Sequence, residues 1–260
     1  MDEDVKYWVK RAIDLHSGDA KIIKLAFHEK FTSRIGDIAF ECFRSPRKEA
    51  RILDLVAGHG NFMQGFAVED EKGNVVRVLD LIHGRPLSKY IEGLNVGHRT
   101  YFTEQFPGIL EQFMACIRAI AFLHEHGEKH GDIRRDHIFI DREDHRYRWI
   151  DFDFNFRHRE NIYAYDLFGL GNILLFLAGK GDVLLHDLRD QQSSLLDVLQ
   201  EEDLNIVFHN RVANLKKIYS YIPESLNRVC MHFAKGANWY YESATQLHHD
   251  LEVFKNEWQT

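Results

Sequence analysis

Residues 130–153 read His-Gly-Asp-Ile-Arg-Arg-Asp-His-Ile-Phe-Ile-Asp-Arg-Glu-Asp-His-Arg-Tyr-Arg-Trp-Ile-Asp-Phe-Asp. Two short apolar runs, 138–140 and 147–150, flank a charged segment, and this pattern predicts a β-hairpin. Asp132 precedes the hairpin and Asp151 follows it. Because neighbouring strands lie about 4.8 Å apart, we expect the two carboxylates to lie close together. One could then accept a proton from a hydroxyl while the other holds a divalent cation.

Helical patterns lie on both sides of this hairpin. Apolar residues in 105–126 recur at steps of three and four, which predicts a long helix that ends at Gly127. Residues 165–179 are apolar nearly all round, which is typical of a core helix too short to span a bilayer. Four more helices are predicted towards the C-terminus, near 193–201, 211–220, 224–235 and 242–255.

The first 82 residues predict a small antiparallel sheet with one helix. Ser45-Pro46 is typical of a capped helix start, and we expect the helix to run to about Ala57, with Gly58 as its stop. The fold class is therefore expected to be α+β. The predicted strands are 5–14, 20–26, 62–68 and 75–81.

The composition is typical of a globular intracellular protein. The chain has 260 residues, of which 45% are hydrophobic and 28% are charged. Its net charge of −7 argues against nucleic-acid binding. The three cysteines have no paired spacing, which indicates a reducing compartment, and we predict a cytoplasmic location. Long uninterrupted apolar stretches are absent from the sequence, so neither a membrane span nor a secretory signal is predicted.

The order of these motifs resembles the catalytic core of the protein-kinase-like superfamily. That family carries H-R-D-L-x-x-x-N followed by D-F-G. This chain has His-Gly-Asp at 130–132, then His137, then Asp-Phe-Asp at 151–153. The H-G-D spelling is more similar to the small-molecule and atypical bacterial branches. His137 stands where the family has an Asn that binds a second magnesium ion, and Asp153 stands where it has a Gly.

A second match lies in the predicted core helix. Its opening, Asp166-Leu-Phe-Gly-Leu-Gly, is similar to the D-x-[WY]-S-x-G of protein kinases. This resemblance implies that the buried Asp166 accepts hydrogen bonds from the catalytic-loop backbone. Residues 222–226 and 240–251 resemble the last helices of bacterial Ser/Thr kinase domains. Only 12 residues lie between Asp153 and Asp166, so we do not expect control by activation-loop phosphorylation.

The resemblance implies a bilobal, single-domain fold over 1–260. Residues 1–82 would form a small antiparallel-sheet N-lobe with one main helix, and residues 83–260 a mostly helical C-lobe. The only glycine before Lys24 is Gly18, so the first strand and the glycine-rich phosphate loop of the family are expected to be missing.

The resemblance also assigns roles in binding ATP and in catalysis. Asp132 would accept a proton from the acceptor hydroxyl, and Arg134 would lie against the γ-phosphate. Lys24, with Lys21 as a competitor, would bind the α- and β-phosphates and be fixed by Glu49. Backbone groups in the segment after the last strand would contact the adenine edge, at Asp80, Leu81 and Ile82.

The metal would be magnesium, with manganese as an alternative. Asp151 is the expected main ligand, with His137 and Asp153 beside it. A neutral imidazole is a poor ligand for magnesium and a better one for manganese. Three further residues would support the site structurally, namely His130, Phe152 and Asp166.

Three functions remain open at this point. The first is an ATP-dependent kinase that acts on protein serine or threonine hydroxyls. The second is a small-molecule kinase similar to the aminoglycoside phosphotransferases, which the H-G-D spelling favours. The third is a pseudokinase, a binding module without turnover, which His137, Asp153 and the missing loop favour. The expected partners are ATP and a protein or small-molecule hydroxyl acceptor, with neither nucleic acid nor membrane.

Overall fold

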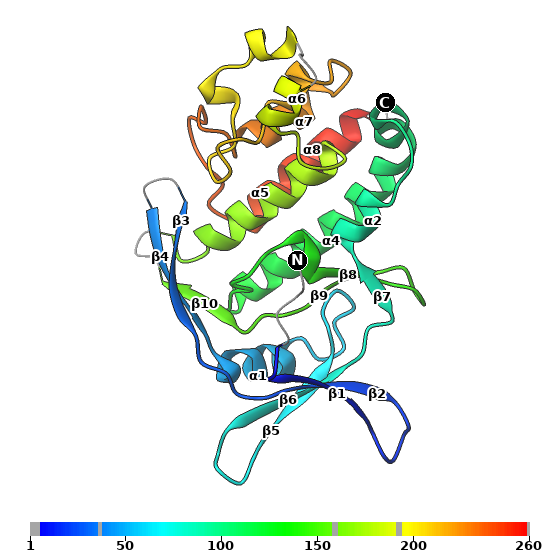
Figure 1. The fold of residues 1–260 in the computed structure, drawn as a ribbon, viewed down its shortest axis with the longest axis vertical. Coiled ribbons are helices and arrows are strands. Elements are labelled where there is room, and N and C mark those ends of the chain that lie inside the picture. The colour runs from blue at the N-terminus through cyan, green and yellow to red at the C-terminus, as the bar shows by residue number, and fades with distance from the viewer. Residues whose placement is uncertain (1–5, 36–37, 158–160, 191–193, 259–260) are drawn as a thin grey trace.

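Small antiparallel sheets and several helices make up the chain, which confirms the predicted α+β class. The computed structural model describes residues 6–35, 38–157, 161–190 and 194–258. Figure 1 shows the sheet of β1, β2, β5 and β6 at one end of the molecule and α6, α7 and α8 towards the other.

The first sheet has four strands in the order β1-β2-β6-β5, and all neighbouring pairs are antiparallel. The four predicted strands are therefore confirmed, although Val5 lies outside the described residues. Strand β5 begins later than predicted, because Phe62 bridges Trp149 and the N–H of Met63 donates to the Trp149 carbonyl. The strands are β1 Val9–Ile13, β2 Ala20–Lys24, β5 Gly65–Glu69 and β6 Val75–Asp80.

Helix α1, Pro46–Leu55, packs against β5 and β6. The side chain of Ser45 accepts a hydrogen bond from the N–H of Lys48, so the predicted N-cap is confirmed. The helix ends slightly before the predicted Ala57, and Gly58 follows with a φ of 76°. That conformation suits glycine, which has no Cβ to clash.

The second sheet has the order β10-β4-β3 and was not predicted. Strand β10 directly follows Asp153 and pairs antiparallel with β4, so that Phe154 lies opposite Arg44. In β4 the buried Phe40 and Cys42 alternate with exposed residues, which is a strand signal that sequence analysis overlooked. The strands are β3 Lys30–Ile35, β4 Ile38–Arg44 and β10 Phe154–Arg157.

The third sheet, in the order β7-β8-β9, contains the predicted hairpin. Ile138 lies opposite Trp149 in it. A Cβ at Gly84 would collide with the carbonyl of Ile140, so only glycine permits β7 to approach β8 there. The strands are β7 Gly84–Pro86, β8 Ile138–Asp141 and β9 Tyr147–Trp149.

Helices dominate the rest of the chain. The long central helix α4 packs against α5 and α8, and α7 also packs against α5 and α8. Tyr101–Gln105 forms a π-helical turn before α4. The helices are α2 Leu87–Glu92, α3 His98–Thr100, α4 Phe106–Glu125, α5 Ala164–Ala178, α6 Leu185–Asp190, α7 Glu224–Met231 and α8 Ala244–Trp258.

Two predicted helices near the C-terminus are wrong. Residues 211–220 contain only a 3₁₀ turn, because the N–H groups of Ala213 and Asn214 both donate to the carbonyl of Asp203 and leave the helical pattern. Residues 194–201 likewise give a 3₁₀ turn, and Ser193 lies outside the described residues. The 3₁₀ turns are Arg135–His137, Ser194–Val198, Glu201–Asp203 and Leu215–Lys217.

The helical segment His98–Glu125 is long and apolar enough to cross a membrane, by length and composition only. Within it Phe113, Ile117 and Ile120 are fully buried in the protein core. A buried core helix passes the same test, so this segment is weak evidence for a membrane location. The absence of a membrane span stays a prediction.

Candidate functional site

Asp132 and Asp151 lie on either side of the imidazole of His137. Its Nδ1 lies 2.9 Å from the carbonyl oxygen of Asp132 and 3.5 Å from Oδ2 of the same residue. Its Nε2 lies 3.7 Å from Oδ2 of Asp151. A carbonyl oxygen only accepts, so Nδ1 carries the hydrogen and Nε2 of the neutral ring keeps its lone pair. The hairpin thus brings the two predicted carboxylates together around one histidine.

The carboxyl group of Asp132 is a stronger base than that of a free aspartate. Burial raises its pKa, against the lowering effects of His137 and Arg134. A raised pKa brings a general base closer to the operating pH, which favours proton transfer. Asp132 is therefore suited to accept a proton from a hydroxyl group.

Lys24 is the centre of a buried ion cluster. Its Nζ lies 2.8 Å from Oε1 of Glu49, 2.5 Å from Oδ1 of Asp151 and 3.4 Å from Oδ2 of Asp153. Burial opposes the charge on Lys24, but these three carboxylates outweigh it and raise the pKa of the lysine. The predicted ion pair between Lys24 and Glu49 is present.

The competing lysine, Lys21, lies elsewhere. It pairs with Asp80 at 2.6 Å near the surface, so Lys24 alone of the two reaches the cluster. The N–H of Leu81 donates to the carbonyl of Ala20 at 3.4 Å, and Ile82 packs against the core. The contact of 80–82 with an adenine ring stays a prediction.

Arg77 also belongs to the cluster, although the sequence did not predict it. It extends from β6 and is almost fully buried. Its Nε donates to Oε2 of Glu49 at 2.9 Å, and its NH2 group lies 3.8 Å from Oδ2 of Asp153. Burial raises the pKa of Glu49, while Lys24 and Arg77 act to lower it. Glu49 is thus fixed between two cations from neighbouring strands.

Asp153 is held by cationic side chains. Its Oδ1 accepts a hydrogen bond from Arg44 at 2.8 Å, while its Oδ2 lies towards Lys24 and Arg77. The guanidinium of Arg44 also lies 3.9 Å over the ring of Phe154. The role of Asp153 as a metal ligand stays a prediction. The cluster balances three cations against three carboxylates, namely Lys24, Arg44 and Arg77 against Glu49, Asp151 and Asp153.

The backbone of Asp151 has a φ of 67°, in the left-handed region that is uncommon outside glycine. Such conformations cost about 1–3 kcal/mol and cluster at functional sites. Burial opposes the charge on Asp151, but Lys24 and His137 hold its pKa below the ordinary value. Asp151 is therefore an anion whose direction is set by an unusual backbone conformation.

Asp166, at the start of α5, fixes the loop 130–132. Its carboxylate accepts hydrogen bonds from the N–H groups of His130 and Gly131, each at 2.8 Å, and lies 3.1 Å from Nε2 of His124. The predicted hydrogen bonds to the loop backbone are confirmed. Burial works against the charge of Asp166, but the hydrogen bond from His124 lowers its pKa.

His130 and Phe152 form the apolar support beneath the loop. Both side chains are fully buried, and their rings meet edge to face with centroids 5.7 Å apart. Burial lowers the pKa of His130 to about 3, so its ring is neutral. Its Nδ1 accepts a hydrogen bond from the N–H of Asp132 at 3.3 Å.

Lys48 was also missed by sequence analysis. It comes from α1, is almost fully buried, and donates to the carbonyl oxygens of His130 at 2.7 Å, Phe152 at 2.9 Å and Phe154 at 2.5 Å. Burial lowers its pKa to about 8. Lys48 directly precedes Glu49, the partner of Lys24. One turn of α1 therefore contacts the segment of His130, the segment of Phe152 and Lys24.

The chain matches no protein-family model. A search of curated proteins gives no match either. The functional interpretation therefore rests on the motifs and on the geometry of the residues around Lys24, Asp132 and Asp151.

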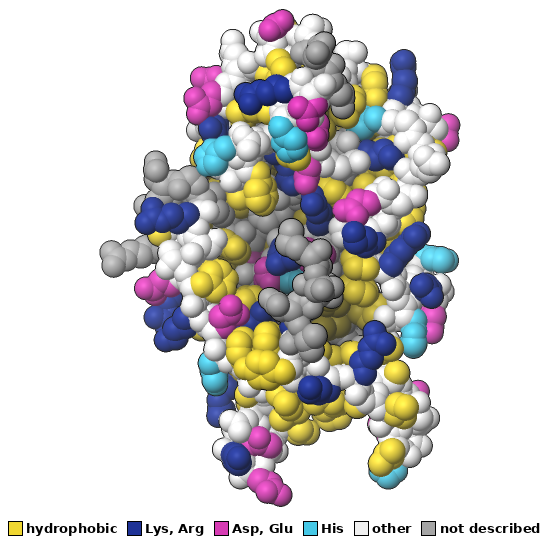
Figure 2. Space-filling model, viewed as in Figure 1, with side chains coloured by type: hydrophobic (Ala, Val, Ile, Leu, Met, Phe, Trp, Pro, Cys, Tyr) yellow, Lys and Arg dark blue, Asp and Glu magenta, His cyan; other side chains and the backbone are white. Residues whose placement is uncertain are grey.

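A divalent cation would have two protein ligands here, Oδ2 of Asp151 and Nε2 of His137. No group of three or more His, Cys, Asp or Glu residues placed to hold a metal occurs in the described part of the chain. This donor pair fits a cation that takes its other ligands from phosphate oxygens and water, and its imidazole nitrogen favours manganese over magnesium. Figure 2 shows acidic, basic and histidine side chains together near the centre of one face.

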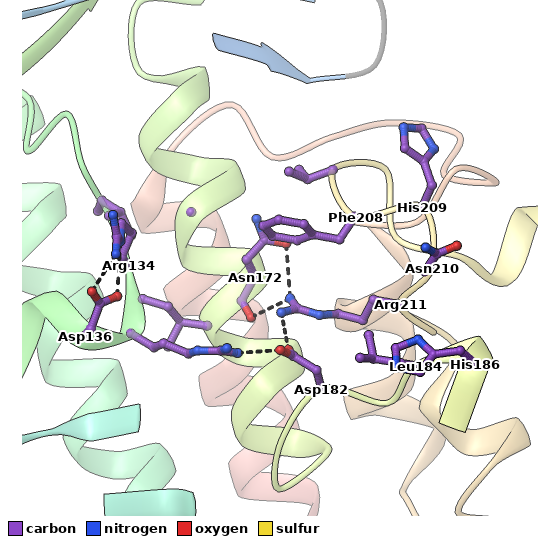
Figure 3. A pocket seen from close by; sticks show the side chains of 15 residues that line it. Arg134, Asp136, Asn172, Asp182, Leu184, His186, Phe208, His209, Asn210 and Arg211 are labelled. Atoms are coloured by element: carbon purple, nitrogen blue, oxygen red, sulfur yellow. Dashed lines mark hydrogen bonds and ion pairs between the residues drawn. The ribbon is translucent and has the colours of Figure 1, made fainter. Parts of the chain in front are cut away.

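Arg134 lies in a neighbouring pocket rather than in the ion cluster. Its guanidinium pairs with Asp136 at 2.6 Å and 3.1 Å. The pocket has a volume of about 630 Å³, and its lining residue Ile133 directly follows Asp132 in the chain. Figure 3 shows Arg134 and Asp136 together on one side of this pocket. The contact of Arg134 with a γ-phosphate stays a prediction. Four segments line this pocket, namely 133–136, 169–173, 182–186 and 207–211.

Proposed function

We propose that this protein is an ATP-dependent phosphotransferase that transfers the γ-phosphoryl group to a hydroxyl, on a bilobal protein-kinase-like fold. The observation that carries the proposal is the buried contact of Lys24 with both Glu49 and Asp151. Phosphoryl transfer depends mainly on positioning and charge neutralisation. A lysine held by one acid and placed beside a second acid supplies a phosphate ligand next to a metal ligand.

In this proposal ATP lies between a smaller lobe, 1–82, and a larger lobe, 83–260. Lys24 leaves Asp151 to bind the α- and β-phosphates, while Glu49 keeps the lysine in place. The adenine edge contacts the backbone at 80–82. Arg44 and Arg77 keep the remaining carboxylates neutralised while the lysine changes partner.

The transfer step needs a general base, and at the γ-phosphorus one bond forms while another breaks. The acceptor oxygen forms a bond to the γ-phosphorus while the bond to the bridging oxygen of ADP breaks, and the hydroxyl proton passes to Asp132. Asp151 and His137 would hold magnesium or manganese, which would neutralise the phosphate charge. The hydrogen bonds from the loop backbone to Asp166 hold Asp132 in place during this step.

The first candidate acceptor is a protein serine or threonine hydroxyl, which the resemblance of α5 and of the C-terminal helices favours. The second candidate is a small-molecule hydroxyl, which the pocket beside Asp132 favours. Pockets of about 300–1,000 Å³ suit small ligands. Both acceptors use the same site for ATP.

Thermal unfolding with ATP and either magnesium or manganese tests the proposal. A ligand at a hundredfold excess over its Kd stabilises by about 2.7 kcal/mol, and each kcal/mol raises Tm by roughly 2–4 °C for a chain of this size. We expect a metal-dependent rise in Tm that Asp151→Asn abolishes. The control Asp54→Asn changes an exposed acid on α1 and should keep the rise.

Turnover separates an enzyme from a binding module. ADP release with an acceptor panel of proteins, amino alcohols and sugars should be lost in Asp132→Asn while the Tm rise with ATP remains. A Tm rise without turnover for any acceptor would favour the pseudokinase. The absence of any rise with either metal at millimolar ATP would contradict the proposal.

A further inference from the structure

The pocket beside Asp132 has an excess of positive charge. Arg134, Arg135 and Arg211 line it together with two carboxylates, Asp136 and Asp182. His186 and His209 also line it, and both are exposed. Three guanidinium groups against two carboxylates leave one net positive charge on a protein whose overall charge is −7. A local field of the opposite sign to the whole molecule points to an anionic ligand.

The arginines are held in fixed directions before any ligand arrives. Asp182 accepts hydrogen bonds from Arg135 at 2.8 Å and from Arg211, so one carboxylate orients two guanidinium groups. Arg211 also donates to the carbonyl oxygen of Asn172 at 3.2 Å. Figure 3 shows Arg211 between Asn172 and Asp182, with Arg134 and Asp136 on the other side of the pocket. Oriented guanidinium groups bind phosphate and carboxylate oxygens through paired hydrogen bonds.

Arg211 is a buried arginine whose hydrogen bonding is incomplete. It is 6% exposed, and its Nε has no hydrogen-bond partner among the residues that the structure describes. An unpaired buried donor destabilises a fold. An anion in the pocket would supply an acceptor next to this guanidinium, whose other nitrogens are held by Asn172 and Asp182.

The pocket is also placed for an acceptor. Ile133 and Arg134, which line it, directly follow the proposed base in the chain. Gly169, on α5, lines it as well, and a Cβ there would collide with Ile133. The close packing of α5 on the loop thus fixes the position of the pocket relative to Asp132.

We propose that this pocket binds the phosphate or carboxylate group of a small hydroxyl-bearing acceptor, and so presents the acceptor hydroxyl to Asp132. The inference rests on the proposed phosphotransferase function and names the class of its acceptor. The volume of about 630 Å³ matches a small molecule. Arg135 and Arg211 would contact the anion, and Arg134 lines the side of the pocket that follows the loop 130–132 in the chain.

Calorimetric titration tests the pocket independently of ATP turnover. The probes are inorganic phosphate, glycerol 3-phosphate and gluconate, with glycerol and glucose as neutral counterparts. We expect the anions to bind and the neutral compounds to bind about tenfold more weakly or not at all. Arg135→Gln should weaken anion binding by about tenfold. Arg135 is 32% exposed, so this variant is expected to fold, and Arg211→Gln is the second variant.

The matched control is Arg142→Gln, an exposed arginine in the turn of the hairpin and outside the pocket lining. It should leave anion binding unchanged. No anion binding up to about 10 mM, or binding that Arg135→Gln does not weaken, would overturn the inference. Arginine-dependent binding of an acidic serine peptide, without binding of the small anions, would overturn the small-molecule acceptor.

The two proposals can fail separately. Arginine-dependent anion binding without a metal-dependent Tm rise on adding ATP would support the anion pocket and contradict the phosphotransferase. ATP binding with unchanged anion titrations in Arg135→Gln would support the nucleotide site and overturn the anion pocket. Phosphorylation of glycerol 3-phosphate or gluconate, lost in both Arg135→Gln and Asp132→Asn, would support both proposals.

Discussion

Lys48 donates a hydrogen bond to the carbonyl oxygen of Phe152 across 2.9 Å, and this contact joins α1 to the segment that carries Asp151. The same ammonium group donates to the carbonyl oxygen of His130, in the loop that carries Asp132. An ammonium group has three hydrogens, and the three backbone carbonyls around it use all of them. A single side chain therefore positions α1 relative to both segments.

We expect Lys48→Met to destabilise the protein strongly, because three carbonyl oxygens in the interior lose their donor. The free energy of unfolding should fall by about 3 kcal/mol or more, since each unsatisfied buried group costs about 1–3 kcal/mol. Urea unfolding measures the loss. The control Lys89→Met removes an exposed lysine that pairs with the exposed Glu92, and should change little. Equal stability of the two variants would contradict the role of Lys48.

Arg77→Met should also destabilise the fold, because it leaves Glu49 with one cation in a fully buried setting. Breaking a buried ion pair from one side costs about 3–5 kcal/mol. Arg51→Met is the matched control, since Arg51 forms an exposed pair with Glu128 and such pairs contribute about 0–1 kcal/mol. Thermal unfolding of both variants at neutral pH compares them directly. Similar Tm values would show that Arg77 does not secure Glu49.

Asp132→Asn and Asp136→Asn should shift stability in opposite directions at pH 7. Burial raises the folded pKa of Asp132, so its charge destabilises the fold above the unfolded pKa of about 3.9. Replacing it with Asn should raise Tm at pH 7, and the gain should vanish below about pH 4. Activity should be lost at the same time.

The pKa of Asp136 is shifted in the opposite direction to that of Asp132. Burial opposes its charge, but the hydrogen bond from Arg134 lowers its folded pKa. Its stabilising contribution is present above the unfolded pKa and is lost as the pH falls through the folded pKa. Asp136→Asn should therefore lower Tm at pH 7, with a difference that shrinks in acid. Tm shifts of the same sign for both variants at pH 7 would contradict this assignment.

His137→Asn should change the metal preference of the site. The variant replaces an imidazole nitrogen with an amide oxygen, which magnesium prefers. We expect the Tm rise with ATP to be larger for manganese in the natural protein, and the variant to gain with magnesium relative to manganese. Melts with each metal at equal concentration measure the ratio. An unchanged ratio would remove His137 from the metal site.

The elements predicted well were those with a strong local signal. The period of apolar residues identified α4, and the apolar composition identified α5. Ser45 and Pro46 marked the start of α1 because capping is a local interaction. The hairpin between the two aspartates followed from its two apolar runs and charged turn.

The residues that were missed act through distant partners. Lys48 lies in a charged helix start and has nothing local to distinguish it from a solvated lysine. Arg77 has a weak sequence signal, because it falls on the same face of β6 as the buried Val75 and Leu79. A charge on that face indicates a buried pair, but only the fold identifies Glu49 as its partner. Strand β10 is too short to predict without its neighbour β4.

The pairing of β10 with β4 bears on how the molecule opens. Backbone amides in Phe154–Arg157 belong to the same sheet as residues more than a hundred positions earlier. Release of Asp153 would require that sheet to separate, together with the contacts of Arg44 and Lys48. Amide hydrogen exchange in this segment should therefore follow the cooperative unfolding of the sheet rather than a local fluctuation. The backbone conformation of the proposed metal-binding turn, 151–153, is thus fixed when the chain folds. We do not expect a separate activation step to form it.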